Sequence, residues 1–169
     1  MMPDHAWLLA HIPHQGTMCL LDAVTDWDAL HIRCTANSHR RADNPLRAHD
    51  RLGVACGIEY AAQAMAAHGA ILAASNSAPG AGYLASVRSV NLLVARLDDI
   101  AADLDIEAER LSGDDNIILY GFRVSAAGRA LLSGRATVVL DAAVINTAGL
   151  NTAVLDAAKL NAAKWGAPI

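Results

Sequence analysis

The sequence predicts an α+β domain in which an antiparallel sheet wraps one long helix. Residues 53–74 are an apolar run of good helix formers, too long for a strand and apolar on nearly every face. From Tyr83 onward, only strand-like segments separated by turns follow. A chain of 169 residues is long enough to bury one sizeable core. Since a helix without a polar face must be covered on most sides, strands packed around it are the expected arrangement.

The elements before the long helix are short. Asp4–His11 reads as a helix with Asp4 as its N-cap, because an Asp side chain can accept the free amides of a first turn. Met18–Asp26 and Leu30–Ala36 read as two strands joined by a turn at Asp26–Asp28. The polar stretch Ser38–Arg51 reads as a loop.

Four further strands are predicted after the helix, over Tyr83–Val94, Ala101–Arg110, Asn116–Ser125 and Ala130–Leu140. We therefore place one domain over residues 1–141 and a C-terminal extension over residues 142–169. The extension contains both lysines and favours a short helix over Thr152–Lys164.

Composition and charge exclude several classes of protein. A formal net charge of -4 and a pI near 5.9 exclude a strongly basic nucleic-acid binder. Polar residues within the long helix disfavour a membrane span, and the N-terminus lacks the basic region of a signal peptide. Three cysteines, an odd number without metal-like spacing, indicate free thiols in a reducing cytoplasm. The motifs indicate neither a cofactor nor a metal site.

Glu59 and Gln63 are the first candidates for chemistry. Four residues apart in the long helix, they fall on one face of it. A carboxyl group in an apolar helix is costly unless it is paired or has a function, and burial suits it to donate a proton near neutral pH. Capping of a backbone group or an ion pair with an arginine is an equally good explanation.

Histidine is the usual partner for such a carboxyl group, and the chain has seven. His14 follows a proline in a loop, and His49 lies in the arginine-rich loop shortly before the helix. Four of the others are expected at surface or sheet positions (His5, His31, His39) or packed on the opposite face of the helix (His68).

Four segments together carry a resemblance to a known family. They are Pro13-His14-x-x-x-Met18-x-Leu20-Leu21-Asp22, then Asn44-Pro45, then Gly57-Ile58-Glu59-Tyr60-Ala61-Ala62-Gln63, then Gly82-Tyr83-Leu84-Ala85-Ser86-Val87. In this order the sequence resembles the hot-dog 3-hydroxyacyl-[acyl-carrier-protein] dehydratases, most closely the branch that serves aryl-polyene-type pathways and more distantly the FabZ type. The resemblance spans about Ile12 to Leu140.

The resemblance implies a fold, an assembly and a set of roles. It implies a hot-dog fold, a dimer with continuous sheets, and a site at the dimer interface for an acyl group on acyl carrier protein. Glu59 falls on the family's helix carboxylate, which helps the β-hydroxyl leave as water while a histidine removes the α-proton. Gln63, on the family's glutamine, is expected at the substrate. The amides around Gly53 and Val54 would polarise the thioester carbonyl, which suits a helix N-terminus.

The family's usual histidine run, Gly-His-Phe-Pro-Gly, is absent here. His14 matches the Pro-His of the first motif, which borders the active site in this family, so the resemblance favours His14 as the base and leaves His49, in the loop before the helix, as its rival. Two alternatives to an independent dehydratase stay open: a hot-dog acyl-thioester hydrolase, and a non-catalytic subunit of a mixed hot-dog dimer. The four arginines of the 38–51 loop indicate either a basic surface for the acidic carrier protein or an ordinary solvated loop.

Overall fold

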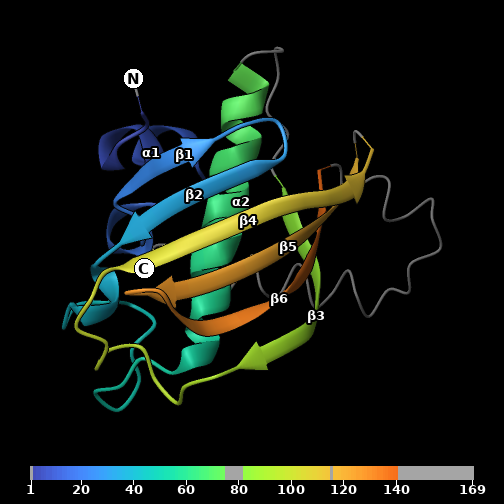
Figure 1. Cartoon of the computed structure of the whole chain (residues 1–169). Coiled ribbons are helices and arrows are strands. Elements are labelled where there is room, and N and C mark those ends of the chain that lie inside the picture. The colour runs from blue at the N-terminus through green and yellow to red at the C-terminus, as the bar shows by residue number, and fades with distance from the viewer. Residues whose placement is uncertain (1, 75–81, 115, 141–169) are drawn as a thin grey trace.

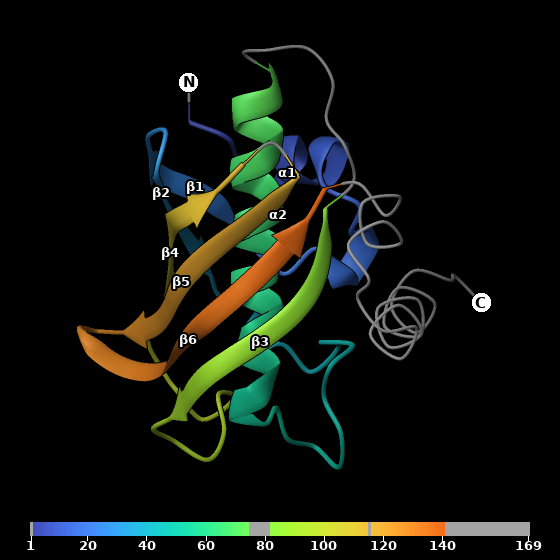
Figure 2. The same ribbon diagram turned by 90° about the vertical axis from the view of Figure 1, so that its right-hand side faces the viewer.

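The computed structural model describes residues 2–74, 82–114 and 116–140, so the predicted extension 142–169 lies outside the described residues. Six antiparallel strands form one sheet in the order β1-β2-β4-β5-β6-β3. Strands β2, β4, β5 and β6 cross in front of the long helix α2 in Figure 1, whereas β3 runs beside it. The quarter turn of Figure 2 shows β5, β6 and β3 passing across α2, so the sheet curves around the helix. The α+β prediction is confirmed. The strands are β1 (Ala23–Trp27), β2 (His31–Ala36), β3 (Tyr83–Leu92), β4 (Leu104–Gly113), β5 (Ile117–Ala126) and β6 (Arg129–Val139).

The helix α2 (Gly57–Ala74) is buried on several sides, as its composition predicts. Nine of its residues are buried and only Ala74 is exposed. It packs on β2, β4 and β5. The inner face of the sheet supplies apolar side chains against it, among them Ile32, Cys34, Leu104, Ile106, Tyr120, Phe122 and Val124. The many alanines of α2 let these strands approach the helix closely.

The predicted helix start at Gly53 is wrong. A 3-10 turn, η3 (Val54–Cys56), precedes α2, and Gly53 is extended. The chain before the turn is held by segment 95–97, because Leu97 N donates to Leu52 O (2.8 Å) and Val54 N donates to Ala95 O (3.3 Å). These bonds keep Gly53 out of the helix.

The first predicted strand is also too long. Met18 ends a 3-10 turn, η1 (Gly16–Met18), and β1 begins only at Ala23 and runs through Trp27, into the predicted turn. The hairpin turn instead follows Asp28, whose carboxylate accepts the amides of Leu30 (2.7 Å) and His31 (2.8 Å). The apolar side chains of Cys19, Leu20 and Leu21 are buried, although the backbone of these residues lies outside β1.

Strand β4 begins three residues later than predicted. The backbone before it is held by a side chain of the 38–51 loop, because Arg40 donates to Ala101 O (2.6 Å) and to Asp103 (2.6 Å). The helix α1 (His5–His11) is confirmed, including its N-cap, since Asp4 Oδ1 accepts the amide of Trp7 at 2.9 Å.

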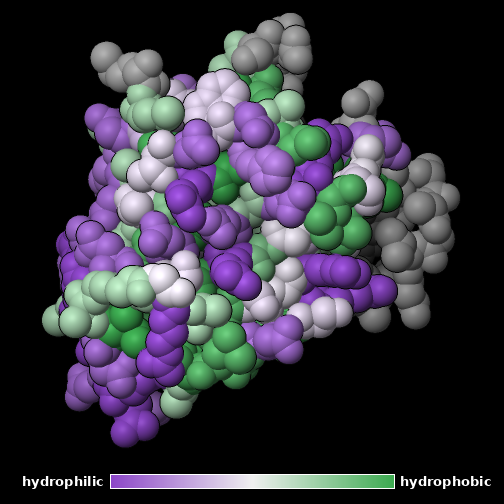
Figure 3. Space-filling model, viewed as in Figure 1, coloured by the Kyte–Doolittle hydropathy of each residue, from purple (hydrophilic) through white to green (hydrophobic). Residues whose placement is uncertain are grey.

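The outer face of the sheet is largely polar. Figure 3 views this face and shows hydrophilic side chains spread over the strands, with smaller apolar areas between them. On β2 and β4, Arg33 pairs with Glu107 and His31 lies 3.4 Å from Glu109. No helix in the described ranges is long and apolar enough to cross a membrane.

Gly57, the first residue of α2, gives a test of the helix–sheet contact. A Cβ added there would lie 2.4 Å from Leu132 Cδ2, and Leu132 is fully buried on β6. We expect Gly57→Ala to lower the free energy of unfolding by about 1–3 kcal/mol, since an overpacked core must shift to relieve the clash. Denaturant unfolding followed by circular dichroism measures the change.

Gly69 on the same helix is the matched control. A Cβ there meets no atom within 4 Å, so Gly69→Ala should raise the free energy of unfolding by up to about 1 kcal/mol. Adding Leu132→Val to Gly57→Ala removes the clashing Cδ atoms and should recover part of the loss. Equal effects of Gly57→Ala and Gly69→Ala would contradict the packing described here.

Candidate active site

His14 and Glu59 meet side chain to side chain. His14 lies in the segment that joins α1 to η1, and Glu59 lies in the first turn of α2. His14 Nε2 is 2.9 Å from Glu59 Oε1. The two side chains keep 19% and 22% of their exposure, so a ligand can reach both. The structure thus brings together the favoured histidine and the helix carboxylate within one chain.

The end of α1 sets the position of His14. Gln15 Nε2 donates to Leu9 O at 2.9 Å, which holds the chain after Pro13 against α1. The other ring nitrogen of His14, Nδ1, is buried and has no hydrogen-bond partner among the described residues. An unpaired acceptor is a smaller loss than an unpaired N–H donor, so this environment favours the tautomer that carries its proton on Nε2.

Gln63 fixes the carboxylate and the segment across from it. Its Nε2 donates to Glu59 Oε1 (3.0 Å) and to Met18 O (2.7 Å), and its Oε1 accepts the amide of Leu20 (2.8 Å). The side chain is fully buried. Since its amide groups are all occupied within the chain, we expect Gln63 to orient Glu59 and not to contact the substrate as the resemblance implied.

These contacts bear on whether Glu59 is in the helix for a structural reason, such as an ion pair with an arginine, or for a chemical function. Within the described part of the chain, Glu59 forms no ion pair with an arginine; its Oε1 is shared by His14 and Gln63. No hydrogen bond from a described residue reaches Oε2. One oxygen is therefore held in place while the other stays available for a ligand.

The backbone amides of Gly53 and Val54, both predicted to polarise the thioester carbonyl, differ in whether they are free to donate. Val54 N–H already donates to Ala95 O, so it is not available to a thioester carbonyl. Gly53 lies between the two hydrogen bonds of this bridge, in the position where the N–H points away from the neighbouring strand. Gly53 is exposed, with no atom within 4 Å of a Cβ built there. Of the two, Gly53 remains a candidate for the carbonyl.

His49 lies apart from the carboxylate. It is exposed in a turn, with a left-handed backbone (φ 52°), and no ion pair or hydrogen bond of its side chain is found among the described residues. His68 is packed as predicted, with Nδ1 3.0 Å from Tyr120 Oη and Nε2 2.8 Å from Asp28 O, and burial lowers its pKa. The prediction of a surface or sheet position for His39 is wrong, because this residue is fully buried in the 3-10 turn η2 (Ser38–Arg40), with Nε2 3.0 Å from Ile100 O.

The arginines of the 38–51 loop are mostly neutralised. Arg40 pairs with Asp103, Arg41 pairs with Asp43, and Arg47 lies 3.8 Å from Asp98. In the described ranges Arg51 alone of the four lacks an acidic partner. The loop is therefore closer to the second explanation, an ordinary solvated loop held by internal ion pairs, than to a basic surface.

Comparison with known families decides the identity. A sequence model of the ApeP-like family, described as ApeP dehydratase, matches residues 8–147, which is most of the chain. The chain belongs to the ApeP-like dehydratase family. A search of curated proteins gives no significant match.

Solved structures show that this ApeP-like chain has the hot-dog fold. A chain of the dehydratase heterocomplex ApeI:P from Xenorhabdus doucetiae is 24% identical with a TM-score of 0.72, over 79% of this chain and 90% of that one. A thioesterase from Pseudomonas aeruginosa is 15% identical with a TM-score of 0.57, over 81% and 93%. A thioesterase from Haemophilus influenzae is 10% identical with a TM-score of 0.53, over 78% and 80%.

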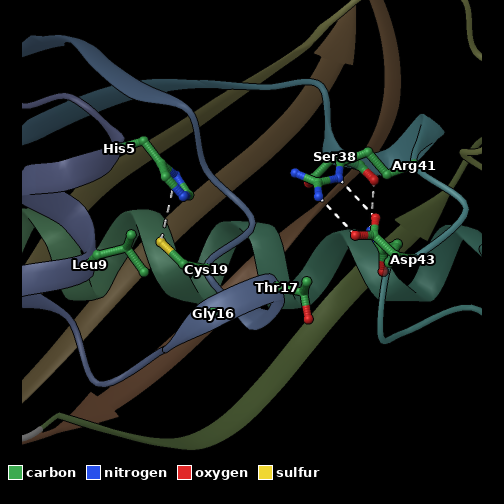
Figure 4. A pocket seen from close by; sticks show the side chains of 9 residues that line it. His5, Leu9, Gly16, Thr17, Cys19, Ser38, Arg41 and Asp43 are labelled. Carbon is green, nitrogen blue, oxygen red and sulfur yellow. Dashed lines mark hydrogen bonds and ion pairs between the residues drawn. The ribbon is translucent and has the colours of Figure 1, made fainter.

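A pocket of about 300 Å³ in this ApeP-like chain is lined by α1, by segment 16–19 and by the loop after β2. Figure 4 shows its lining: His5 and Leu9 come from α1, Gly16, Thr17 and Cys19 from the segment, and Ser38, Arg41 and Asp43 from the loop. Neither His14 nor Glu59 lines it. The thiols are not activated, since burial raises the pKa of Cys19 and of Cys56. No cluster of potential metal ligands occurs among the residues that the structure describes.

Sequence reasoning missed a group of buried polar residues in the loop after β2 and on α2. Ser38, Asn44 and Tyr60 are buried and bonded to one another. Asn44 and Tyr60 lie in the segments that carry the family resemblance, which was the available signal. Ser38 has no such signal, because a serine at the start of a polar loop is ordinary.

Proposed function

We propose that this chain is a dehydratase of 3-hydroxyacyl thioesters on acyl carrier protein, giving trans-2-enoyl thioesters in fatty-acid or polyene-type biosynthesis. The contact of 2.9 Å between His14 and Glu59 carries the proposal. An elimination of water needs a base for the α-proton and an acid for the leaving hydroxyl, and this pair supplies one of each. Membership of the ApeP-like dehydratase family supports the reaction type.

In this reaction one proton is passed between His14 and Glu59, and each turnover returns it to its starting position. The step requires the His14 tautomer that carries its proton on Nδ1. Nε2 of this neutral ring takes the proton from C2, and the electron pair of the C2–H bond forms the C2–C3 double bond as the C3–O bond breaks. The carboxyl group of Glu59 gives its proton to the departing hydroxyl, which leaves as water. His14 is then an imidazolium facing a carboxylate, and return of the proton across their hydrogen bond restores the starting pair.

The thioester carbonyl needs a hydrogen-bond donor while negative charge develops on its oxygen. We assign this role to the exposed Gly53 amide. The acidic carrier protein would bring the acyl group on its phosphopantetheine arm, and because the loop arginines are largely paired, we do not assign its attraction to them. No cofactor takes part in this scheme, and the free thiols fit the predicted cytoplasmic location.

We infer that the working unit is a dimer, either of two copies or with a second hot-dog subunit. The ApeI:P heterocomplex supports a mixed pair. One observation favours a non-catalytic role for this chain within it: His14 Nδ1 is buried without a partner. An acceptor there would hold Nδ1–H and leave Nε2 free as a base, whereas the favoured tautomer keeps the proton on Nε2.

An assay of the wild-type protein separates the candidate functions. We expect a 3-hydroxyacyl carrier protein to be converted to the enoyl form, seen as a loss of 18 Da by mass spectrometry, by the protein alone or with its hot-dog partner. Release of free thiol without enoyl product would instead indicate the thioesterase. Activity that requires the partner and persists in His14→Gln would indicate the non-catalytic subunit.

A further inference from the structure

A buried chain of hydrogen bonds leads from the loop after β2 to the Glu59 carboxylate. It starts at Asn44, whose Nδ2 donates to Tyr60 Oη at 3.0 Å. Tyr60 Oη and Ser38 Oγ are 2.8 Å apart, and Ser38 Oγ donates to Leu20 O at 2.7 Å. Since the Ser38 hydroxyl hydrogen is used on Leu20, the Tyr60 hydroxyl is the donor between the two.

The backbone of Leu20 connects these hydrogen bonds to Gln63 and Glu59. Its amide donates to Gln63 Oε1 at 2.8 Å, and Gln63 Nε2 donates to Glu59 Oε1 at 3.0 Å. Leu20 is thus held through its carbonyl by Ser38 and through its amide by Gln63. The carbonyl and the amide of Leu20 belong to different peptide groups, so the two sets of hydrogen bonds are linked by the position of the Leu20 backbone.

Segment 16–20 needs this support because packing does not hold it on both sides. Gly16, Thr17 and Cys19 line the pocket of about 300 Å³, so one side of the segment faces open space (Figure 4). On its other side, the segment meets α2 through the bonds of Gln63 to Met18 and Leu20. On this side, the buried side chains of Cys19 and Leu20 and these hydrogen bonds together set the position of the segment.

We propose that Tyr60 and Ser38 are positioning residues for the acid–base pair, acting through Leu20 and Gln63 on the orientation of Glu59. The proposal rests on the function proposed above. Neither residue touches the substrate. Losing either hydroxyl leaves the next group in the chain without its partner, frees segment 16–20 toward the pocket, and loosens the amide that holds Glu59 Oε1.

A second tyrosine supplies the matched control. Tyr120 is also buried, its hydroxyl is bonded to His68 at 3.0 Å, and burial raises the pKa of both tyrosines to about 12. Its bond does not lead to Gln63. Tyr60→Phe and Tyr120→Phe therefore remove the same atom from similar surroundings, and only the first change interrupts the chain.

The test compares these variants in kinetics and in amide hydrogen exchange. We expect Tyr60→Phe and Ser38→Ala to lower kcat about five- to tenfold with KM changed less than about twofold, and Tyr120→Phe and Ser38→Thr to keep kcat. The Leu20 amide should exchange at least about tenfold faster in Tyr60→Phe and Ser38→Ala, and at the wild-type rate in Tyr120→Phe.

Combination with Gln63→Ala separates positioning from general loss of stability. Because Tyr60 acts through Gln63, kcat of the double variant should equal that of Gln63→Ala alone, whereas independent effects would multiply. Multiplying effects, or equal Leu20 exchange in the two Phe variants, would overturn the proposal. Absence of dehydratase activity in the wild-type protein would overturn the proposed function. Hydrogen exchange needs no substrate, so the series of hydrogen bonds from Tyr60 to Glu59 can be tested even then.

Discussion

Glu59→Gln is expected to lower kcat/KM for dehydration by about 10²- to 10⁴-fold. The amide has nearly the shape of the carboxyl group and keeps an oxygen to accept the hydrogen bond from Gln63. It cannot give a proton to the leaving hydroxyl or take one back from His14. We expect the loss in kcat and little change in the free energy of unfolding, measured by steady-state kinetics and denaturant titration in whichever assembly the wild type is active.

Glu107→Gln is the matched control, because Glu107 is a carboxylate on the outer face of the sheet, paired with Arg33. Pairs on an exposed surface contribute about 0–1 kcal/mol, so activity and stability should stay near the wild-type values. Wild-type activity in Glu59→Gln would exclude Glu59 as the acid. Equal losses in both variants would show that charge in general, and not the carboxyl group of the site, matters.

The parts of the fold that depend on local pattern were predictable. The length and apolar character of residues 53–74 indicated a helix covered on several sides, and the turn signals separated the strands that follow it. The spacing of Glu59 and Gln63 predicted their contact, since residues four apart in a helix face each other. These features depend on neighbours in the sequence, so the sequence alone was sufficient.

Element ends and loop contacts depend on residues far away in the sequence. The helix begins at Gly57 because segment 95–97 holds Leu52 and Val54, and β4 begins late because Arg40 holds the chain before it. The Arg40–Asp103 pair joins residues more than sixty positions apart. A local sequence pattern cannot predict an acidic partner so far away in the sequence. The loop arginines could therefore be interpreted as a basic surface.

The choice between His14 and His49 depends on the same kind of distant contact. Both lie in loops, and the nearer one in sequence, His49, suits a short path to the helix. The fold reverses this order, because the segment after α1 returns to the first turn of α2 and places His14 2.9 Å from Glu59, while His49 faces solvent. A base must be within hydrogen-bond reach of the reacting groups, so the geometry favours His14.

His14→Gln should therefore lower kcat for dehydration by about 10²-fold or more, while His49→Gln keeps it. Glutamine preserves a polar side chain at both positions without a titrating group, so a difference in rate shows which histidine acts on the reacting groups. Steady-state rates with a 3-hydroxyacyl carrier protein, together with unfolding curves for both variants, measure this difference.

Any other result with the His14→Gln and His49→Gln variants would point to a different arrangement of the site. Loss of activity in His49→Gln alone would require the 38–51 loop to move to the carboxylate and would exclude His14 as the base. Full activity in His14→Gln, combined with loss in Glu59→Gln, would place the base on the partner subunit. This chain would then contribute only the acid to a shared site, which is consistent with the unpartnered Nδ1 of His14.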